Sequence, residues 1–272
     1  MPIYQVVVLA VVQGLTEFLP ISSTAHLALA PWLLGWRDPG LAFDIALHIG
    51  TLAAVLVYFF RDWLQIASQG FGVSYSPDSE LKQRPWLLWM LAAATLPVAV
   101  LGYLFHDQAE SSWRSPFVMG GMLIGVGILM ALADRKARLT KDIAHISFWD
   151  AMAVGLAQAI AIVPGASRSG ITIAAALGCG IQRPAAARFS FLLSTPAIAG
   201  AAAKSLWDLY KAGGVPAGER LGFGLGIALS GIAGWLVIRF LLDYLRRNNL
   251  NFFVWYRLIF GIIVIALAFF RL

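Results

Sequence analysis

The chain has 272 residues, of which 60% are hydrophobic and 12% are charged, and its formal net charge is +6. An ordinary soluble domain carries roughly 25% charged residues, so this composition excludes a soluble globular protein and indicates a membrane-embedded one. The lysines and arginines are scattered at the ends of apolar segments, which is typical of membrane orientation rather than of nucleic-acid binding. Cys179 is the single cysteine, which excludes an intrachain disulfide.

The first apolar stretch, Ile3–Leu19, has no basic region before it and contains Glu17, so we expect no cleaved signal peptide here. It ends at Pro20, and a second short apolar stretch, His26–Trp36, follows. Each is shorter than the roughly 20 residues that a membrane-crossing helix needs. Because proline breaks a helix, and broken backbone at membrane depth is tolerated only beside a protein-walled cavity, the pair predicts a re-entrant helical hairpin.

A second pair of short segments, Ala151–Val163 and Ser169–Ile181, lies on either side of Pro164 and predicts a second re-entrant hairpin. Longer apolar runs fill the rest of the chain, and each is about long enough to cross a membrane. These predicted spans are Leu41–Phe60, Trp86–Phe105, Phe117–Ala133, Ala186–Ala203, Leu221–Leu242 and Phe252–Phe270. The predicted fold class is therefore all-α: a polytopic membrane protein of six transmembrane helices and two re-entrant hairpins, forming one integral membrane domain over residues 1–272.

The two halves of the chain resemble each other. The matching residues, with a one-residue slip, are Gln13 and Gln158, Pro20 and Pro164, Ser23-Thr24 and Ser167-Arg168, Phe43 and Phe189, and His48 and Ser194. Three spanning runs follow each hairpin, so the second copy enters the membrane from the opposite side. This predicts inverted repeats over about residues 1–136 and 147–272, with the two broken hairpins marking the binding site.

Loop charges predict the orientation. One set of loops holds Arg61, Lys82, Arg84, Arg135, Lys136, Arg138, Lys141, Arg183, Arg246 and Arg247, and the other holds Arg37, Arg114, Lys204, Lys211, Arg220 and Arg271. Because cytoplasmic loops are the richer in lysine and arginine, the first set is expected in the cytoplasm and both termini outside.

The first predicted hairpin contains a cluster of polar and ionisable residues. Gln13 and Glu17 lie four residues apart on one helical face, and Ser22–Thr24 occupy the cap and first turn of the next helix. His26 lies on the same face as Ser23, three residues later. An ionisable side chain at membrane depth is costly, so it usually marks a functional site.

In the second hairpin, Ser167, Arg168 and Ser169 open the second helix. Two helix N-termini and a forked guanidinium would bind a polyanion such as phosphate, with Glu17 and His26 as proton carriers. Other interpretations stay open: Arg168 as a purely structural partner of Glu17, Gln13 as a bond to another helix, and His48 as a packed histidine. Glu17 and Gln13 offer oxygens to a divalent ion, but no metal-binding motif is present.

The motifs from Gln13 to His26 and from Pro164 to Gly170 together resemble the undecaprenyl-diphosphate phosphatase family of the bacitracin-resistance type, over essentially the full length. The resemblance implies a bacterial inner-membrane enzyme with six spans and two inverted re-entrant hairpins. It also implies hydrolysis of a C55 prenyl diphosphate lipid, with release of phosphate and of the monophosphate carrier for cell-wall synthesis. The site residues implied are Glu17, Ser22, Ser23, Thr24, His26, Ser167, Arg168, Ser169 and Thr172.

Many members of that family carry a second glutamate where this chain has Gln13, which leaves Glu17 as the expected sole acid. We expect Arg168 to stabilise phosphoryl charge and Ser23 to act as nucleophile, with Glu17 or His26 taking its proton. Direct attack by a water molecule held by Glu17 is the rival mechanism. The resemblance also implies a divalent cation, Mg²⁺ or Ca²⁺, and the loop charges suggest a site that faces the outer side.

A lipid-phosphate flippase or an anion transporter is the alternative function, because inverted repeats with broken helices also hold anions in transporters. The sequence leaves open the oligomeric state and the preferred prenyl chain length.

Overall fold

The computed structural model describes residues 1–37, 39–211 and 213–271, and these form α-helices joined by short turns. The helices of the first half are α1 (Ile3–Phe18), α2 (Ser23–Leu34), α3 (Leu41–Tyr58), α4 (Phe60–Gly70), α5 (Ser79–Lys82), α6 (Leu87–Leu104), α7 (His106–Glu110), the 3₁₀ turn η1 (Ser112–Arg114) and α8 (Pro116–Lys136). Those of the second half are η2 (Ile143–His145), α9 (Phe148–Ala159), η3 (Ile160–Ile162), α10 (Arg168–Gly178), α11 (Arg183–Lys211), η4 (Ala217–Glu219), α12 (Arg220–Leu245) and α13 (Asn251–Arg271).

Among the described residues, four helices are long and apolar enough to cross a membrane: α6, α8, α12 and α13. Helices α3 and α4 qualify together as a fifth candidate, with a bend of 72° between them. The all-helical, polytopic membrane class predicted from the sequence is therefore confirmed.

The predicted span Ala186–Ala203 lies inside α11, which is 29 residues long but is not among these apolar candidates. The guanidinium of Arg188, within that span, pairs with Asp62 at 2.7 Å and with Asp78 at 3.0 Å. These partners belong to α4 and to the loop before α5, so Arg188 secures that loop to α11. The charge of Arg188 inside the predicted span is thus explained by these ion pairs, which the hydrophobic pattern of the sequence does not reveal.

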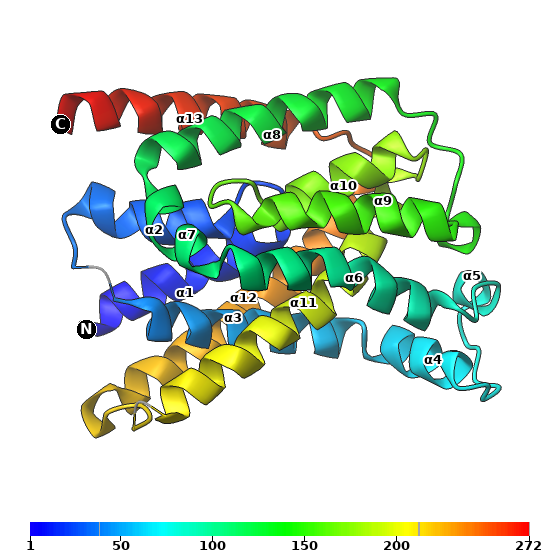
Figure 1. The fold of residues 1–272 in the computed structure, drawn as a ribbon, viewed down its shortest axis with the longest axis horizontal. Coiled ribbons are helices and arrows are strands. Elements are labelled where there is room, and N and C mark those ends of the chain that lie inside the picture. Colours follow the sequence, from blue (N-terminus) through cyan, green and yellow to red (C-terminus); the bar gives the residue numbers. More distant parts are fainter. Residues whose placement is uncertain (38, 212, 272) are drawn as a thin grey trace.

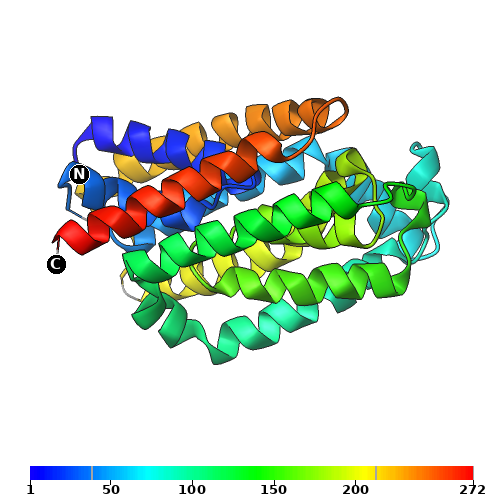
Figure 2. The same cartoon turned by 90° about the horizontal axis from the view of Figure 1, so that it is seen from above.

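The two chain termini lie at one end of the molecule, and α4 and α5 lie at the other (Figure 1). Seen from above, α13 runs alongside α8 over most of its length (Figure 2). Helix α1 packs on α12, and α9 packs correspondingly on α6. Each hairpin therefore lies against a long helix from the other half of the chain.

Glycines allow this close packing, since small residues let helix backbones approach each other. A Cβ at Gly50 of α3 would collide with the carbonyl of Ile227 in α12, and one at Gly155 of α9 would collide with the carbonyl of Ala94 in α6. In both places a glycine lets two helices from opposite halves of the chain pack closely.

Both predicted hairpins are present as a helix, a break and a second helix. Helix α1 ends at Phe18, before Pro20, and α9 with η3 ends at Ile162, before Pro164. The second helices begin at Ser23 and Arg168. Their N-caps are Ser22 and Ser167, so the structure matches Ser22 with Ser167, whereas the sequence comparison had matched Ser23 with Ser167. Gln13 and Gln158 are 145 positions apart, and the two caps Ser22 and Ser167 are also 145 positions apart. The serines of the two halves therefore match without the one-residue slip that the sequence predicts between the glutamines and the serines.

Candidate active site

The breaks of the two hairpins meet inside the molecule. The hydroxyl of Ser169, in the first turn of α10, donates to the carbonyl of Leu19 in the first break at 3.0 Å. The fully buried guanidinium of Arg257, from α13, donates to the carbonyl of Pro20 at 3.3 Å and to those of Gly165 and Ala166 at 3.1 Å each. One side chain thus holds both breaks together and satisfies carbonyls that no helix can satisfy there.

Two serines in the breaks adopt a conformation that L-residues rarely take. Ser22 has φ 79° and Ser167 has φ 66°, and both side chains cap the helix that follows. The Ser22 hydroxyl accepts from Ala25 N at 3.4 Å, and the Ser167 hydroxyl accepts from Gly170 N at 3.1 Å. Left-handed backbone costs roughly 1–2 kcal/mol at a non-glycine residue and tends to occur at functional sites. Its occurrence at both breaks indicates that the turns are built to point the next residues inward.

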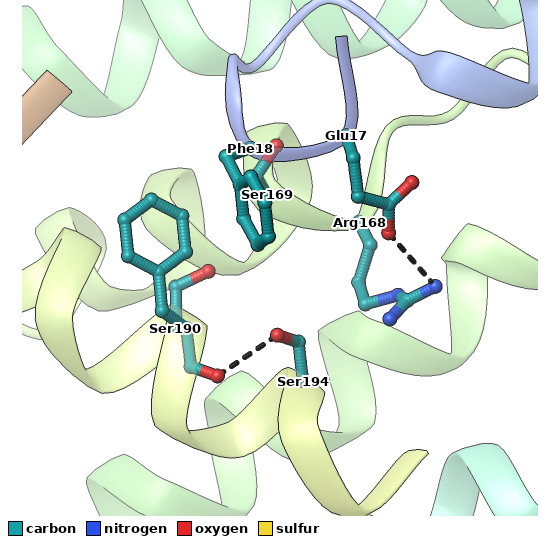
Figure 3. A pocket seen from close by; sticks show the side chains of 7 residues that line it. Glu17, Phe18, Arg168, Ser169, Ser190 and Ser194 are labelled. Atoms are coloured by element: carbon teal, nitrogen blue, oxygen red, sulfur yellow. Dashed lines mark hydrogen bonds and ion pairs between the residues drawn. The ribbon is translucent and has the colours of Figure 1, made fainter. Parts of the chain in front are cut away.

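Those next residues are Ser23 and Arg168, and both contact the carboxylate of Glu17. The Ser23 hydroxyl donates to Oε2 of Glu17 at 2.5 Å, and Gln13 Nε2 donates to the same oxygen at 3.1 Å. The Arg168 guanidinium lies 3.5 Å from Oε1 of Glu17 (Figure 3). The Glu17 side chain is only 4% exposed, so these contacts take the place of hydration around its charge.

The polar groups around Glu17 are not all used within the protein. Nη1 of Arg168 and Oε1 of Gln13 are buried and have no hydrogen-bond partner among the described residues. A buried polar atom without a partner is costly, about 1–3 kcal/mol, and such atoms at functional sites commonly bind a ligand or water. The site therefore offers one unused donor and one unused acceptor beside the carboxylate.

A cavity of about 260 Å³ gives access to this centre. Thr24, His48 and Arg168 line it, together with Asp44 of α3 and Arg114 of η1. The segment between α7 and α8, to which η1 belongs, lies toward the end of the molecule that holds both termini (Figure 1). A second, much smaller cavity lies next to Glu17 and Arg168 and is lined by Ser169, Ser190 and Ser194 (Figure 3).

The sequence-predicted residues fall into two groups. Gln13, Glu17, Ser23 and Arg168 are in contact, and exposed Thr24 lines the larger cavity. The remaining ones support the hairpins: Ser22 and Ser167 are caps, Ser169 bonds Leu19, and the Thr172 hydroxyl bonds the Arg168 carbonyl at 2.7 Å and the Ser190 hydroxyl at 2.5 Å.

His26 points away from the Glu17 carboxylate. Its Nδ1 lies 2.6 Å from the Ser22 carbonyl, and its Nε2 lies 2.6 Å from the Tyr256 hydroxyl. The ring also stacks on Phe260, with centroids 4.8 Å apart. Both ring nitrogens are therefore occupied in holding the first break against α13, which differs from the proton-carrying position expected from its spacing to Ser23.

Sequence reasoning missed two residues of the site. His48 Nε2 lies 3.6 Å from Oε2 of Glu17, and its Nδ1 lies 2.8 Å from the Asp44 carbonyl. Its position in a long apolar run made it look like a packed histidine, although its match with Ser194, which lines the smaller cavity, was a usable signal. Arg257 was not singled out at all, yet an arginine in the middle of an apolar helix is itself a signal.

The side chains of this site can be compared with the ligands that a divalent cation requires. Among the described residues no three His, Cys, Asp or Glu side chains gather into a metal site. Glu17 supplies the single carboxylate at the junction of the breaks, and the unused Oε1 of Gln13 supplies a neutral oxygen. Mg²⁺ typically binds through one or two protein oxygens together with substrate phosphates and water, so these residues fit a cation that arrives with a phosphate ligand.

Comparison with known proteins identifies the family of this chain. Residues 6–263 match the family model described as bacitracin resistance protein BacA. The chain is 48% identical to an undecaprenyl-diphosphatase of Desulforudis audaxviator over 98% of both chains. It is 44% identical to one of Moorella thermoacetica over the whole of both chains. The protein therefore belongs to the BacA family of bacitracin resistance proteins.

Proposed function

We propose that this protein is a membrane-embedded undecaprenyl-diphosphatase, which hydrolyses undecaprenyl diphosphate to undecaprenyl phosphate and inorganic phosphate. The observation that carries this proposal is the buried group of Glu17, Ser23 and Arg168 where two broken helices meet. The family relationship supplies the substrate, and the site supplies a base that is contacted by both a hydroxyl and a cation.

The terminal phosphate of the substrate binds between the N-termini of α2 and α10. Helix N-termini carry unpaired N–H groups and partial positive charge, which favour phosphate. The unused Nη1 of Arg168 donates to a phosphoryl oxygen, and its charge stabilises the oxygens of the transferring group.

Ser23 is the nucleophile in this proposal. Its hydroxyl already donates to Glu17 at 2.5 Å, so the carboxylate is placed to take the proton as Oγ attacks the terminal phosphorus. The bond from that phosphorus to the bridging oxygen breaks, and the lipid monophosphate leaves. Glu17 passes the proton it took from Ser23 to the departing lipid monophosphate and is again a carboxylate. Water then attacks the phosphoserine while Glu17 accepts a proton from that water. Glu17 returns this proton to Oγ of Ser23 as the bond from Oγ to phosphorus breaks, which restores the hydroxyl and releases inorganic phosphate. In the rival mechanism Glu17 activates water directly and Ser23 only binds phosphate.

A divalent cation, Mg²⁺ or Ca²⁺, would be held by Glu17 and the Gln13 amide oxygen together with the diphosphate. When bound it supplies additional neutralisation of phosphate charge. His26 is assigned a positioning role, because it bonds the Ser22 carbonyl and the Tyr256 hydroxyl.

The membrane arrangement proposed for this function has six spans, with α11 as the sixth, and two re-entrant hairpins in inverted repeats of about residues 1–136 and 147–272. The corresponding contacts of α1 with α12 and of α9 with α6 support the repeats. The larger cavity reaches the end that carries both termini and the smaller number of loop cations. This supports an inner-membrane protein whose site opens to the outer side.

The test is phosphate release from a prenyl diphosphate by the purified full chain in detergent, with Mg²⁺ or Ca²⁺ added. We expect Glu17→Gln and Arg168→Lys each to lower kcat by at least about 10²-fold, because each removes a group that stabilises the transition state. Glu219→Gln and Arg220→Lys make the same chemical changes away from the site and should leave kcat within about twofold of wild type. A wild-type protein that releases no phosphate would contradict the proposal, and lipid-phosphate transport would be tested next.

A further inference from the structure

The larger cavity contains a second arginine that the proposed chemistry does not use. Arg114, at the end of η1, lines the same cavity of about 260 Å³ as Arg168. Arg168 belongs to the hairpin break in the interior, whereas Arg114 belongs to the segment between α7 and α8, toward the end with both termini (Figure 1). The cavity is therefore lined by two guanidinium groups that come from different parts of the fold.

Arg114 is held at the cavity wall but only loosely paired. Its Nη2 lies 3.8 Å from Oδ2 of Asp44, which also lines the cavity, and its side chain is 28% exposed. At that distance the two groups form an ion pair without a short hydrogen bond. The guanidinium can keep this neighbour and still donate to a second anion, since it has five N–H groups.

Apolar side chains make up much of the rest of the lining. They include Ile45, Ile162, Ile198 and Ala202, and Asp44 is the one carboxylate among the lining residues that the structure describes. A cavity of about 150 Å³ holds one benzene molecule, so a volume of about 260 Å³ holds a ligand of about ten non-hydrogen atoms. That is room for a diphosphate and the first atoms of a chain, but not for a C55 tail, which must stay in the surrounding lipid.

We infer that Arg114 binds the phosphate that remains on the lipid, while Arg168 binds the phosphate that is removed. This inference rests on the proposed function. The terminal phosphate enters deepest, beside Ser23, and the chain-bearing phosphate stops nearer the outer surface at Arg114. The chain then leaves past the apolar side chains into the membrane.

This arrangement makes the site selective for a diphosphate, because only a ligand with two phosphates reaches both arginines. It also divides the two products between them. Inorganic phosphate binds at Arg168, whereas the prenyl monophosphate binds at Arg114, so the two products inhibit through different residues. If Arg114 binds phosphate, its substitution should weaken inhibition by the prenyl monophosphate but not by inorganic phosphate. If its pair with Asp44 is only structural, substitution should not discriminate between the two products.

The experiment measures inhibition of farnesyl diphosphate hydrolysis by each product, using the purified full chain. For Arg114→Gln we expect KM for farnesyl diphosphate and Ki for farnesyl monophosphate to rise about tenfold, as expected for loss of one charge-assisted contact. Ki for inorganic phosphate should stay within about twofold. Arg114→Lys keeps a positive charge beside Asp44 but loses the forked guanidinium group. It should therefore give a smaller rise in the same two constants. Arg220→Gln removes the same charge outside the cavity and should change none of them.

Equal changes in both Ki values, or no change in either for both Arg114 variants, would overturn the inference while leaving the phosphatase function in place. A wild-type protein that does not hydrolyse farnesyl or undecaprenyl diphosphate would instead overturn the proposed function, and this inference with it.

Discussion

At the scale of single residues, the chemistry of the site is concentrated on one carboxylate. Glu17 has Ser23 and Gln13 on one oxygen and Arg168 on the other. A buried carboxylate stays charged only with such partners, and each partner is also a group that phosphoryl transfer requires. The same contacts that stabilise Glu17 in the resting protein therefore arrange the base, the nucleophile and the cation.

Ser23→Ala distinguishes the two mechanisms at this scale. If Ser23 is the nucleophile, kcat for phosphate release should fall by about 10²-fold or more, because a covalent step is lost. Ser230→Ala is the matched control: it removes a buried hydroxyl that donates to the Leu47 carbonyl at 2.9 Å and makes no hydrogen bond to Glu17, Ser23 or Arg168 among the described residues. Near-normal turnover by Ser23→Ala would instead support direct attack by water.

At the scale of elements, the decisive feature is that two broken helices are fixed to each other. Arg257 makes five hydrogen bonds to backbone carbonyls, three of them in the two breaks and two in α8. It is fully buried and comes from α13, which belongs to neither hairpin. The relative position of Ser23 and Arg168 therefore depends on a third helix.

Arg257→Met should destabilise the protein by about 3–5 kcal/mol, because the break carbonyls lose their donors in the interior. The apparent midpoint of thermal unfolding in detergent should fall, and kcat should fall with it at temperatures where the variant is folded. Arg239→Met, on the exposed face of α12, is the control and should change neither. An unchanged midpoint for Arg257→Met would show that other contacts hold the breaks together.

At the scale of the whole molecule, the lining of the larger cavity indicates the side from which substrate enters. The larger cavity extends from the hairpin breaks toward the end that carries both termini. At the opposite end, the Arg188 pairs with Asp62 and Asp78 tie the loop before α5 to α11. Substrate is therefore expected to enter from the terminal end.

Thiol labelling tests this orientation. In a Cys179→Ser background, Ser112→Cys should react with a membrane-impermeant maleimide added to spheroplasts. Ser112 is exposed and belongs to η1, in the segment between α7 and α8 that lies toward the terminal end (Figure 1). Ser76→Cys, exposed in the loop before α5, should react only after permeabilisation. Ser205→Cys, in the cavity wall, should label from the same side as Ser112→Cys and be protected by farnesyl diphosphate. The reverse pattern would place the cavity on the cytoplasmic side.

The sequence by itself determined the membrane class, the two broken hairpins and most of the polar residues at their breaks. It could do so because apolar length, proline and helix capping are local properties. Only the tertiary structure decided which of these residues meet. His26 bonds Tyr256, 230 positions away, His48 reaches Glu17 from a neighbouring helix, and Arg257 joins both breaks. Contacts between residues so distant in the chain leave no periodic trace in the sequence, because they depend on how the helices pack.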